Sequence, residues 1–276
     1  MLIDTFTFYN ELDLLEIRLN ELYDVVDKFI IVEANKTQSL ISKPFNFEAN
    51  MDRYKNFLDK IVYIKVEDCP SNDKNLWTME NFQRNCVMRG LDQIGISESD
   101  LIMISDMDEI PRASSIKACL KHPEISQLPV YVLDNDFYVY FMNLKVSGRT
   151  WVGTSIFRPS LLSKFSIQNI KDGKNTYPVI KNSGWHFSWL GGYKKIHEKA
   201  MSCIEPLDKS TIPSLNDFKN YFDSFLNNEN KKFIHIENFN INGASLEINE
   251  DISEYPRFLL KNYYKYSKYF LHKNND

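Results

Sequence analysis

The chain lacks the features that mark several large classes of protein. Its 276 residues include 33 Lys and Arg against 37 Asp and Glu, a formal net charge of −4. A nucleic-acid-binding protein needs a basic surface to neutralise phosphates, so we expect no nucleic-acid partner. The four cysteines (Cys69, Cys86, Cys119 and Cys203) show no C-x-x-C spacing. This excludes the usual zinc and disulfide frameworks and favours free thiols in a reducing compartment.

Long hydrophobic runs are also missing. No stretch approaches the ~18 consecutive apolar residues of a transmembrane helix. Residues 1–16 carry acids early and lack a basic segment followed by an apolar one, so they do not have the pattern of a signal peptide. From the sequence alone we therefore expect a soluble, cytoplasmic protein with no transmembrane segment.

Short apolar runs alternate with helical patterns over the first ~110 residues, which is typical of right-handed βαβ units. The patterns predict strands at 2–8, 29–32, 61–66 and 101–104, and helices at 11–23 and about 79–94. Further strands are expected at 131–141 and 151–157, and mostly helices from Ser214 onward, the last at 258–271. These patterns predict an α/β fold, with a mostly parallel, Rossmann-like sheet flanked by helices. We expect a main domain over 1–212 and a helical C-terminal extension over 213–276 packed on it.

The strongest candidate site is the segment LIMISDMDEIPR at 101–112, where an apolar strand runs directly into Asp106, Asp108 and Glu109. Ligands of parallel sheets bind beyond the carboxyl ends of the strands, and both aspartates can converge there on one cation as the chain turns. Oxygen ligands of this kind suit Mg²⁺ or Mn²⁺ bridging a diphosphate. The alternative is a solvated acidic turn before a helix that begins near Pro111.

Two further segments hold candidate donor contacts. In ENFQRN at 80–85, Arg84 and Asn85 are expected near a helix start, which favours an anion, although an exposed salt bridge would also explain the arginine. Glu33 directly follows a strand, where it either contacts a ribose or base or bonds to a neighbouring loop.

A late segment, GWHFSWLGG at 184–192, combines aromatic residues with glycines that allow tight loops. His186 is either a third metal ligand beside the two aspartates or a core histidine packed among aromatics. Trp185 and Trp189 have the side chains that stack on the face of a sugar.

Together these segments resemble glycosyltransferase family 17. The resemblance rests on the blocks at 4–35, 80–85, 101–112, 184–192 and 255–266, and it is collinear over nearly the whole chain. It implies a GT-A fold, a UDP-sugar donor (UDP-GlcNAc in characterised relatives), a Mn²⁺ or Mg²⁺ cofactor, and inversion at the anomeric carbon. On this basis we expect a metal site made of Asp106, Asp108 and His186. The expected donor contacts are Glu33, Arg84, Asn85, Asp106 and Trp185.

The resemblance also implies a mechanism. The cation and Arg84 would neutralise the leaving diphosphate, while a carboxylate takes the proton of the attacking acceptor hydroxyl. The sequence leaves three candidates for this base, Glu205, Asp136 and Glu109. The acceptor would be a glycan or a glycoconjugate. Eukaryotic members carry a membrane anchor, which this sequence does not show, so we expect a bacterial or viral type of enzyme.

Two other functions stay open at this point, besides a transferase that uses another nucleotide sugar. A sugar-phosphate nucleotidyltransferase also places acids beyond a parallel sheet. That class usually has a Gly-rich, basic loop after its first strand, and residues 6–11 contain neither Gly nor Lys. A non-catalytic glycan-binding module would use Trp151, Trp185 and Trp189 as stacking platforms and would need no nucleotide.

Overall fold

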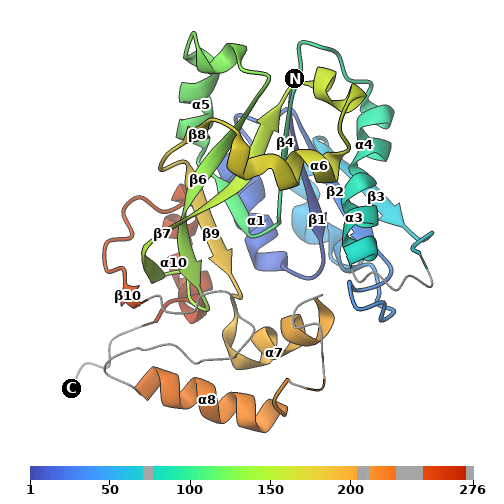
Figure 1. Ribbon diagram of the computed structural model, residues 1–276. Helices are drawn as coiled ribbons and strands as arrows, with labels where there is room; N and C mark the ends of the chain where they lie inside the picture. Colours follow the sequence, from blue (N-terminus) through green and yellow to red (C-terminus); the bar gives the residue numbers. More distant parts are fainter. Residues whose placement is uncertain (71–76, 204–209, 211, 228–244, 272–276) are drawn as a thin grey trace. The chain divides into compact units, whose positions relative to one another are not determined.

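The computed structural model describes residues 1–70, 77–203, 210, 212–227 and 245–271 (Figure 1). The chain forms two compact units, which are described separately below. The first consists of residues 1–135 and 151–185, and the second of residues 136–150 and 186–276.

The first unit is built on a sheet whose strands follow the order β3-β2-β1-β4-β7-β6-β9-β5. Strands β1 to β4 are parallel to one another, and β7 is antiparallel to β4. In chain order the elements up to β4 are β1 (Leu2–Phe8), α1 (Leu12–Leu22), β2 (Lys28–Ala34), α2 (Asn46–Ala49), the 3₁₀ helix η1 (Met51–Phe57), β3 (Ile61–Val66), α3 (Trp77–Asn85), α4 (Val87–Ile94) and β4 (Leu101–Ser105). The α/β fold and its parallel strands are therefore confirmed.

The later elements of this unit return to the same sheet. They are β5 (Glu109–Pro111), α5 (Ala113–Lys121), the 3₁₀ helix η2 (Ile125–Gln127), β6 (Val130–Val139), β7 (Leu144–Phe157), the 3₁₀ helix η3 (Pro159–Ser163), α6 (Ile167–Asp172), the 3₁₀ helix η4 (Gly173–Thr176), β8 (Val179–Ile180) and β9 (Gly184–Ser188). Part of each of β6, β7 and β9 belongs to the second unit, namely residues 136–139, 144–150 and 186–188.

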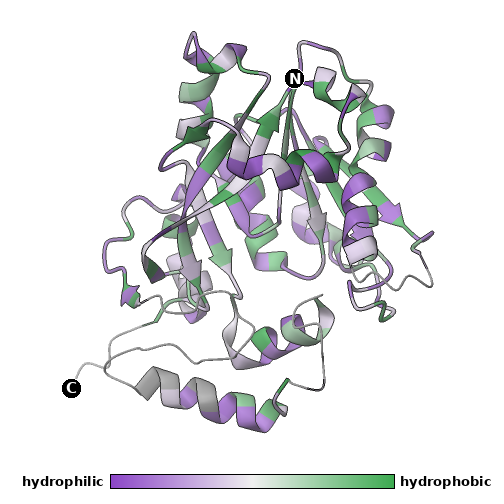
Figure 2. Ribbon diagram, viewed as in Figure 1, coloured by the Kyte–Doolittle hydropathy of each residue, from purple (hydrophilic) through white to green (hydrophobic). Residues whose placement is uncertain are grey.

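The central strands are buried on both faces, as their uninterrupted apolar runs predict. Every residue of β4 is buried, and Ile30, Val32 and Ile102 pack in one apolar cluster with Val87 and Leu91 of α4. The hydrophobic residues of these strands and the inner sides of the helices show as green in Figure 2. This packing leaves the polar residues that follow β4 at the carboxyl edge of the parallel strands.

The structure corrects the single helix expected at 79–94. Two helices, α3 and α4, meet at Cys86, whose N–H is shared between the carbonyls of Phe82 and Gln83, each at 3.1 Å. Such a shared bond tightens the turn toward 3₁₀ geometry and interrupts the α-helix. Gly95, with a φ of +74°, then ends α4 in the left-handed conformation that glycine adopts easily.

Other predicted elements also differ in extent. The strand expected at 151–157 is the second half of β7, and the segment expected as loops around His186 forms β9. The helix expected near Pro111 is present, but Pro111 is not its first residue, because Pro111 ends β5 and extended Arg112 donates its N–H to the carbonyl of Ser183 at 2.7 Å. Helix α5 therefore starts at Ala113.

The second unit contains the remaining parts of β6, β7 and β9 with α7 (Gly192–Ser202), α8 (Leu215–Asn227) and β10 (Leu246–Ile248), which is antiparallel to β7. The last expected helix, 258–271, is replaced by three short helices, α9 (Arg257–Lys261), α10 (Tyr263–Tyr266) and η6 (Ser267–Tyr269). The non-helical backbone of Asn262 (φ −114°, ψ 26°) separates the first two. Tyr255, Tyr266 and Phe270 are buried, so these aromatic side chains pack inside the protein.

None of the four cysteines, all of which lie in the described part of the chain, forms a disulfide. Among the described residues, no helix is long and apolar enough to cross a membrane. The division into domains at 212 and 213 stays a prediction.

Helix α4 packs so closely on β2 that it needs a glycine. A Cβ atom on Gly90 would lie 2.6 Å from Cγ2 of Ile30. We expect Gly90→Leu to lower the free energy of unfolding by about 1–3 kcal/mol through overpacking. Asp92→Leu, on the exposed side of the same helix, is the control and should change it by no more than about 0.5 kcal/mol. Urea unfolding measures both, and equal losses would refute close packing at Gly90.

Candidate active site

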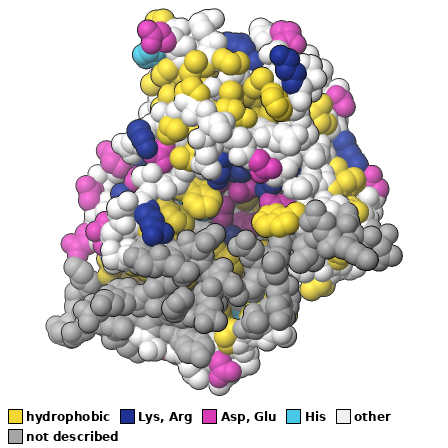
Figure 3. Space-filling model, in the orientation of Figure 1, with side chains coloured by type: hydrophobic (Ala, Val, Ile, Leu, Met, Phe, Trp, Pro, Cys, Tyr) yellow, Lys and Arg dark blue, Asp and Glu magenta, His cyan; other side chains and the backbone are white. Residues whose placement is uncertain are grey.

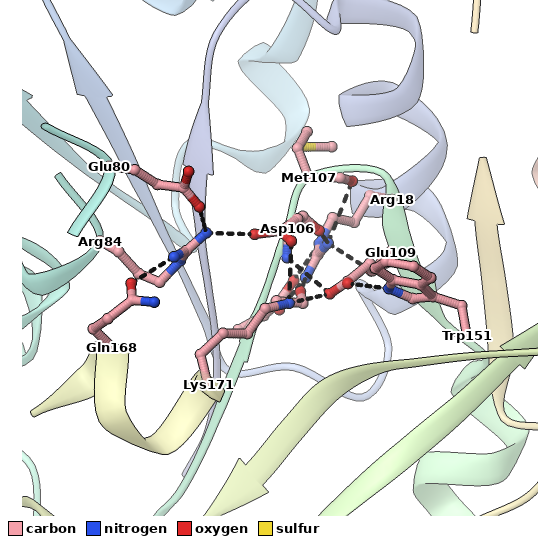
Figure 4. Close-up of polar contacts among 11 residues, drawn as sticks. Arg18, Glu80, Arg84, Asp106, Met107, Glu109, Trp151, Gln168 and Lys171 are labelled. Atoms are coloured by element: carbon pink, nitrogen blue, oxygen red, sulfur yellow. Dashed lines mark hydrogen bonds and ion pairs between the residues drawn. The ribbon is translucent and has the colours of Figure 1, made fainter. Parts of the chain in front are cut away.

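A buried arginine holds residues 106–109, which follow β4 and are called the acidic loop below. Arg18 of α1 is fully buried and forms a two-pronged ion pair with Asp4 of β1, at 2.8 Å from Nε and 2.6 Å from Nη2. Its Nη1 donates to the carbonyls of Asp106 and Glu109 at 3.0 and 2.9 Å, and its Nη2 to Ser105 Oγ at 2.6 Å (Figure 4). The backbone of the loop is thus hydrogen-bonded to the guanidinium of Arg18, which is buried in the core.

Glu109 closes the same loop from its other end. Its side chain is fully buried, and Oε2 accepts the backbone N–H of Asp106 at 2.9 Å. Oε1 accepts the indole N–H of Trp151 at 2.6 Å, and the ammonium of Lys171 bonds to Oε2. A carboxylate with this many charged and polar partners is fixed in position.

Asp106 lies between two cations. Arg84 of α3 donates to its Oδ1 at 2.9 Å, and Lys171 of α6 lies 3.3 Å from Oδ2. Burial alone would raise the pKa of Asp106, but Lys171 and Arg84 hold it well below its usual range. The Asp106 side chain still exposes 38% of its surface, far more than Lys171 at 6% or Arg84 at 5%. Asp106 is therefore an ionised carboxylate that a ligand can reach.

Each of the two cations also has a carboxylate of its own. Arg84 pairs with Glu80 at 2.6 Å and bonds to the side chain of Gln168, while Lys171 bonds to Glu109. Lys174 of η4 lies nearby, with its ammonium 4.5 Å from the centre of the Trp151 ring. Burial lowers the pKa of Lys174, an effect that Glu109 and Asp106 partly oppose. Dark blue and magenta side chains meet near the middle of the face shown in Figure 3.

The acidic loop supplies oxygen ligands but not a complete metal cage. Asp108 is mostly buried, with 8% of its surface exposed, and follows Asp106 by two residues. Within the described part of the chain, no group of three or more His, Cys, Asp or Glu side chains could hold a metal ion. Mg²⁺ is usually bound by one or two carboxylates, with waters and substrate phosphates as its other ligands, so two aspartates fit such an ion.

Arg84 and Asn85 lie in the last turn of α3, not near a helix start as the sequence suggested. The expected attraction of an anion to a helix N-terminus is therefore wrong for them. Arg84 instead reaches the acidic loop through its side chain, and Oδ1 of Asn85 accepts the backbone N–H of Gln168 at 3.1 Å. These bonds join α3 to α6 beside Asp106.

The other expected donor residues have local partners. Glu33 is fully buried and accepts bonds from Lys43, Asn46, Phe47 and Tyr63, at 2.6 to 3.0 Å. This is the bonding to a neighbouring loop that the sequence left open. Donor contacts of Glu33 and Trp185 stay predictions.

Trp185 is only 2% exposed, and the guanidinium of Arg112 lies 4.3 Å from the centre of its ring. Trp151, another proposed stacking platform, donates a hydrogen bond to Glu109, and the ammonium of Lys174 lies over its ring.

The remaining predicted residues belong to the second unit. Asp136 forms an ion pair with Lys145 at 2.8 Å. His186 lies on β9 with 6% of its surface exposed, and its ring stacks on Phe137 with centroids 5.0 Å apart. This is the packing of a core histidine that the sequence kept as the alternative to a metal ligand. Glu205 lies outside the described residues. The metal role of His186 and the catalytic roles of Asp136 and Glu205 stay predictions.

Sequence reasoning missed Arg18, Asp4, Glu80 and Lys171. A signal existed for the first two, because Arg18 occupies the buried side of a helix, four residues from Leu14 and Leu22, and Asp4 interrupts an apolar strand. Charged residues in such positions are almost always paired. Lys171 likewise shares the buried face of α6 with Ile167 and Ile170, but no motif marks it.

The comparisons with known proteins identify the family. The family model described as glycosyltransferase family 17 matches residues 1–230, and the chain belongs to this family. The resemblance indicated by the sequence blocks is confirmed, and so is the predicted α/β sheet flanked by helices.

Two relatives are beta-1,4-mannosyl-glycoprotein 4-beta-N-acetylglucosaminyltransferases. The rat protein is 22% identical over 228 residues, covering 72% of this chain and 42% of the relative. The human protein is 22% identical over 221 residues, covering 70% and 41%. This chain thus spans about two fifths of the length of these relatives. A similar solved structure is S. aureus TarS 1–349 in complex with UDP-GlcNAc, 14% identical, covering 86% of this chain and 72% of that one with a TM-score of 0.45.

The Arg18–Asp4 pair should be a large contributor to stability. We expect Arg18→Met to lower the free energy of unfolding by about 3–5 kcal/mol, because it leaves Asp4 charged and buried without its partner. Arg89→Met is the matched control, since Arg89 forms an exposed ion pair with Asp68 and should lose at most about 1 kcal/mol. Denaturant unfolding of both variants checks this, and similar losses would contradict the role of Arg18.

Proposed function

We propose that this chain is a metal-dependent, inverting glycosyltransferase that moves GlcNAc from UDP-GlcNAc to a hydroxyl group of a glycan or glycoconjugate. The observation that carries the proposal is the accessible carboxylate of Asp106, held between Arg84 and Lys171 directly beyond β4. Family membership supports sugar transfer, and the names of the rat and human relatives support GlcNAc as the sugar.

The residues of the acidic loop have complementary tasks in this proposal. Asp106 and Asp108 would hold Mn²⁺ or Mg²⁺, whose charge offsets the charge of the leaving diphosphate. Arg84 presents a planar set of donors beside Asp106, and such a group pairs well with phosphate oxygens. Arg18 and Glu109 keep the loop in one conformation, so no reorganisation is needed when charge develops on the leaving group.

The base that accepts the proton of the acceptor hydroxyl must be within reach of the substrate. Glu109 has no exposed surface, and both of its oxygens are bonded. We therefore favour Asp136 or Glu205 for this role. Burial of Trp185 and the contacts of Trp151 give less support to a glycan-binding module that relies on exposed tryptophans.

The donor and the metal requirement are tested together. We expect binding of UDP-GlcNAc in the presence of Mn²⁺ and its loss in EDTA, measured by calorimetry beside UDP-GalNAc, UDP-Glc, UDP-Gal and GDP-Man. Asp108→Asn should weaken Mn²⁺-dependent binding by about 100-fold or more, since even outer partners of metal ligands contribute 10- to 100-fold. Asp92→Asn, at an exposed position of α4, is the control and should bind as the wild type does. Full binding in EDTA or in Asp108→Asn would refute the metal site.

The base is tested by removing each carboxylate in turn. We expect either Asp136→Asn or Glu205→Gln to lower kcat by about 10²- to 10⁴-fold, the usual contribution of a general base. The affinity for UDP-GlcNAc should not change, because the base acts on the acceptor. Kinetics with a fixed acceptor and calorimetry with the donor separate the two effects. If both variants keep their kcat, neither residue is the base.

A further inference from the structure

Lys171 is buried, and it joins two carboxylates of the acidic loop. Its contact with Glu109 is a short hydrogen bond, whereas its ammonium is 3.3 Å from Asp106. Glu109 is itself fixed by Trp151 and by the N–H of Asp106. The contact between Lys171 and Asp106 is therefore the longer of the two, and it involves the more exposed carboxylate.

We propose that Lys171 is a built-in counter-cation of the acidic loop, which neutralises Asp106 while no metal is bound and gives up this contact when a divalent cation arrives. The inference rests on the metal-dependent function proposed above. Lys171 keeps its bond to Glu109 throughout, so releasing Asp106 does not leave a buried ammonium without a partner.

This arrangement answers a physical problem of any metal site in a buried loop. Carboxylates arranged for a dication repel one another when the dication is absent, and the low dielectric of a protein interior strengthens that repulsion. Lys171 removes the repulsion between Asp106 and Glu109, because it lies between them. Arg84 has a similar double pairing, with Glu80 and Asp106, so Asp106 is shared between two cations that each have another partner.

The exchange makes Lys171 a competitor of the metal. Without its charge, Asp106 should attract Mn²⁺ more strongly, while the metal-free protein should become less stable. A lysine that instead bound the diphosphate would affect nucleotide affinity and would leave the affinity for Mn²⁺ unchanged. The first role therefore predicts a change in the affinity for Mn²⁺ when Lys171 is replaced, and the second predicts a change in the affinity for the nucleotide alone.

The test compares Lys171→Met with the wild type in the absence of nucleotide. We expect the variant to bind Mn²⁺ about 10-fold more tightly by calorimetry. In EDTA its Tm should be lower by about 5 °C or more, and saturating Mn²⁺ should recover most of that loss. Lys171→Gln, which can still donate a hydrogen bond to Glu109, is the second variant and should show the same gain in affinity if Lys171→Met folds poorly.

Lys181→Met is the control, because Lys181 pairs with a different carboxylate, that of the buried Asp134, at 2.8 Å. Its affinity for Mn²⁺ should equal that of the wild type. Equal or weaker Mn²⁺ binding by both Lys171 variants would overturn the inference, as would loss of UDP binding with unchanged Mn²⁺ affinity. Failure of the proposed function looks different, because then neither wild type nor variants would bind Mn²⁺, with or without UDP.

Discussion

The ion pair between Arg18 and Asp4 is the interaction on which the acidic loop depends. Asp4 lies on the central strand β1, and Arg18 lies on the helix that follows it. Two charges buried in this way are costly unless every donor and acceptor is used. Arg18 meets that condition by bonding to carbonyls of the loop, so the most stable arrangement of the core is also the one that shapes the site.

The loop itself combines a fixed half and an accessible half. Glu109 is buried and bonded on both oxygens, whereas Asp106 is exposed enough to meet a ligand. Asp106 is kept ionised by cations from two helices that are far apart in the sequence, Arg84 of α3 and Lys171 of α6. Charge already present and oriented before substrate binds is the usual means by which an enzyme stabilises a leaving group. The arrangement suits the transfer reaction proposed for this member of glycosyltransferase family 17.

Much of the fold could be predicted because its strands are simple apolar runs. The strands at 2–8, 61–66 and 101–105 are found within a residue of their expected ends. The errors arose where local pattern and tertiary bonding disagree. The segment around His186 contains glycines that suggest loops, yet pairing within the sheet extends it as β9. Similarly, the shared bond at Cys86 divides a helix whose periodicity continues unbroken.

Asp106, Asp108 and Glu109 could be found from sequence because they follow an apolar strand directly, and chain order alone places them at the carboxyl edge of the sheet. Their partners could not. Arg84, Lys171 and Trp151 come from three separate elements, and what brings them to one loop is the pairing and packing of β4, β7 and the helices around them. A local sequence pattern indicates where a residue lies along its own helix or strand. Which charges meet across elements depends on the three-dimensional packing, so the electrostatics of this site belong to the tertiary structure.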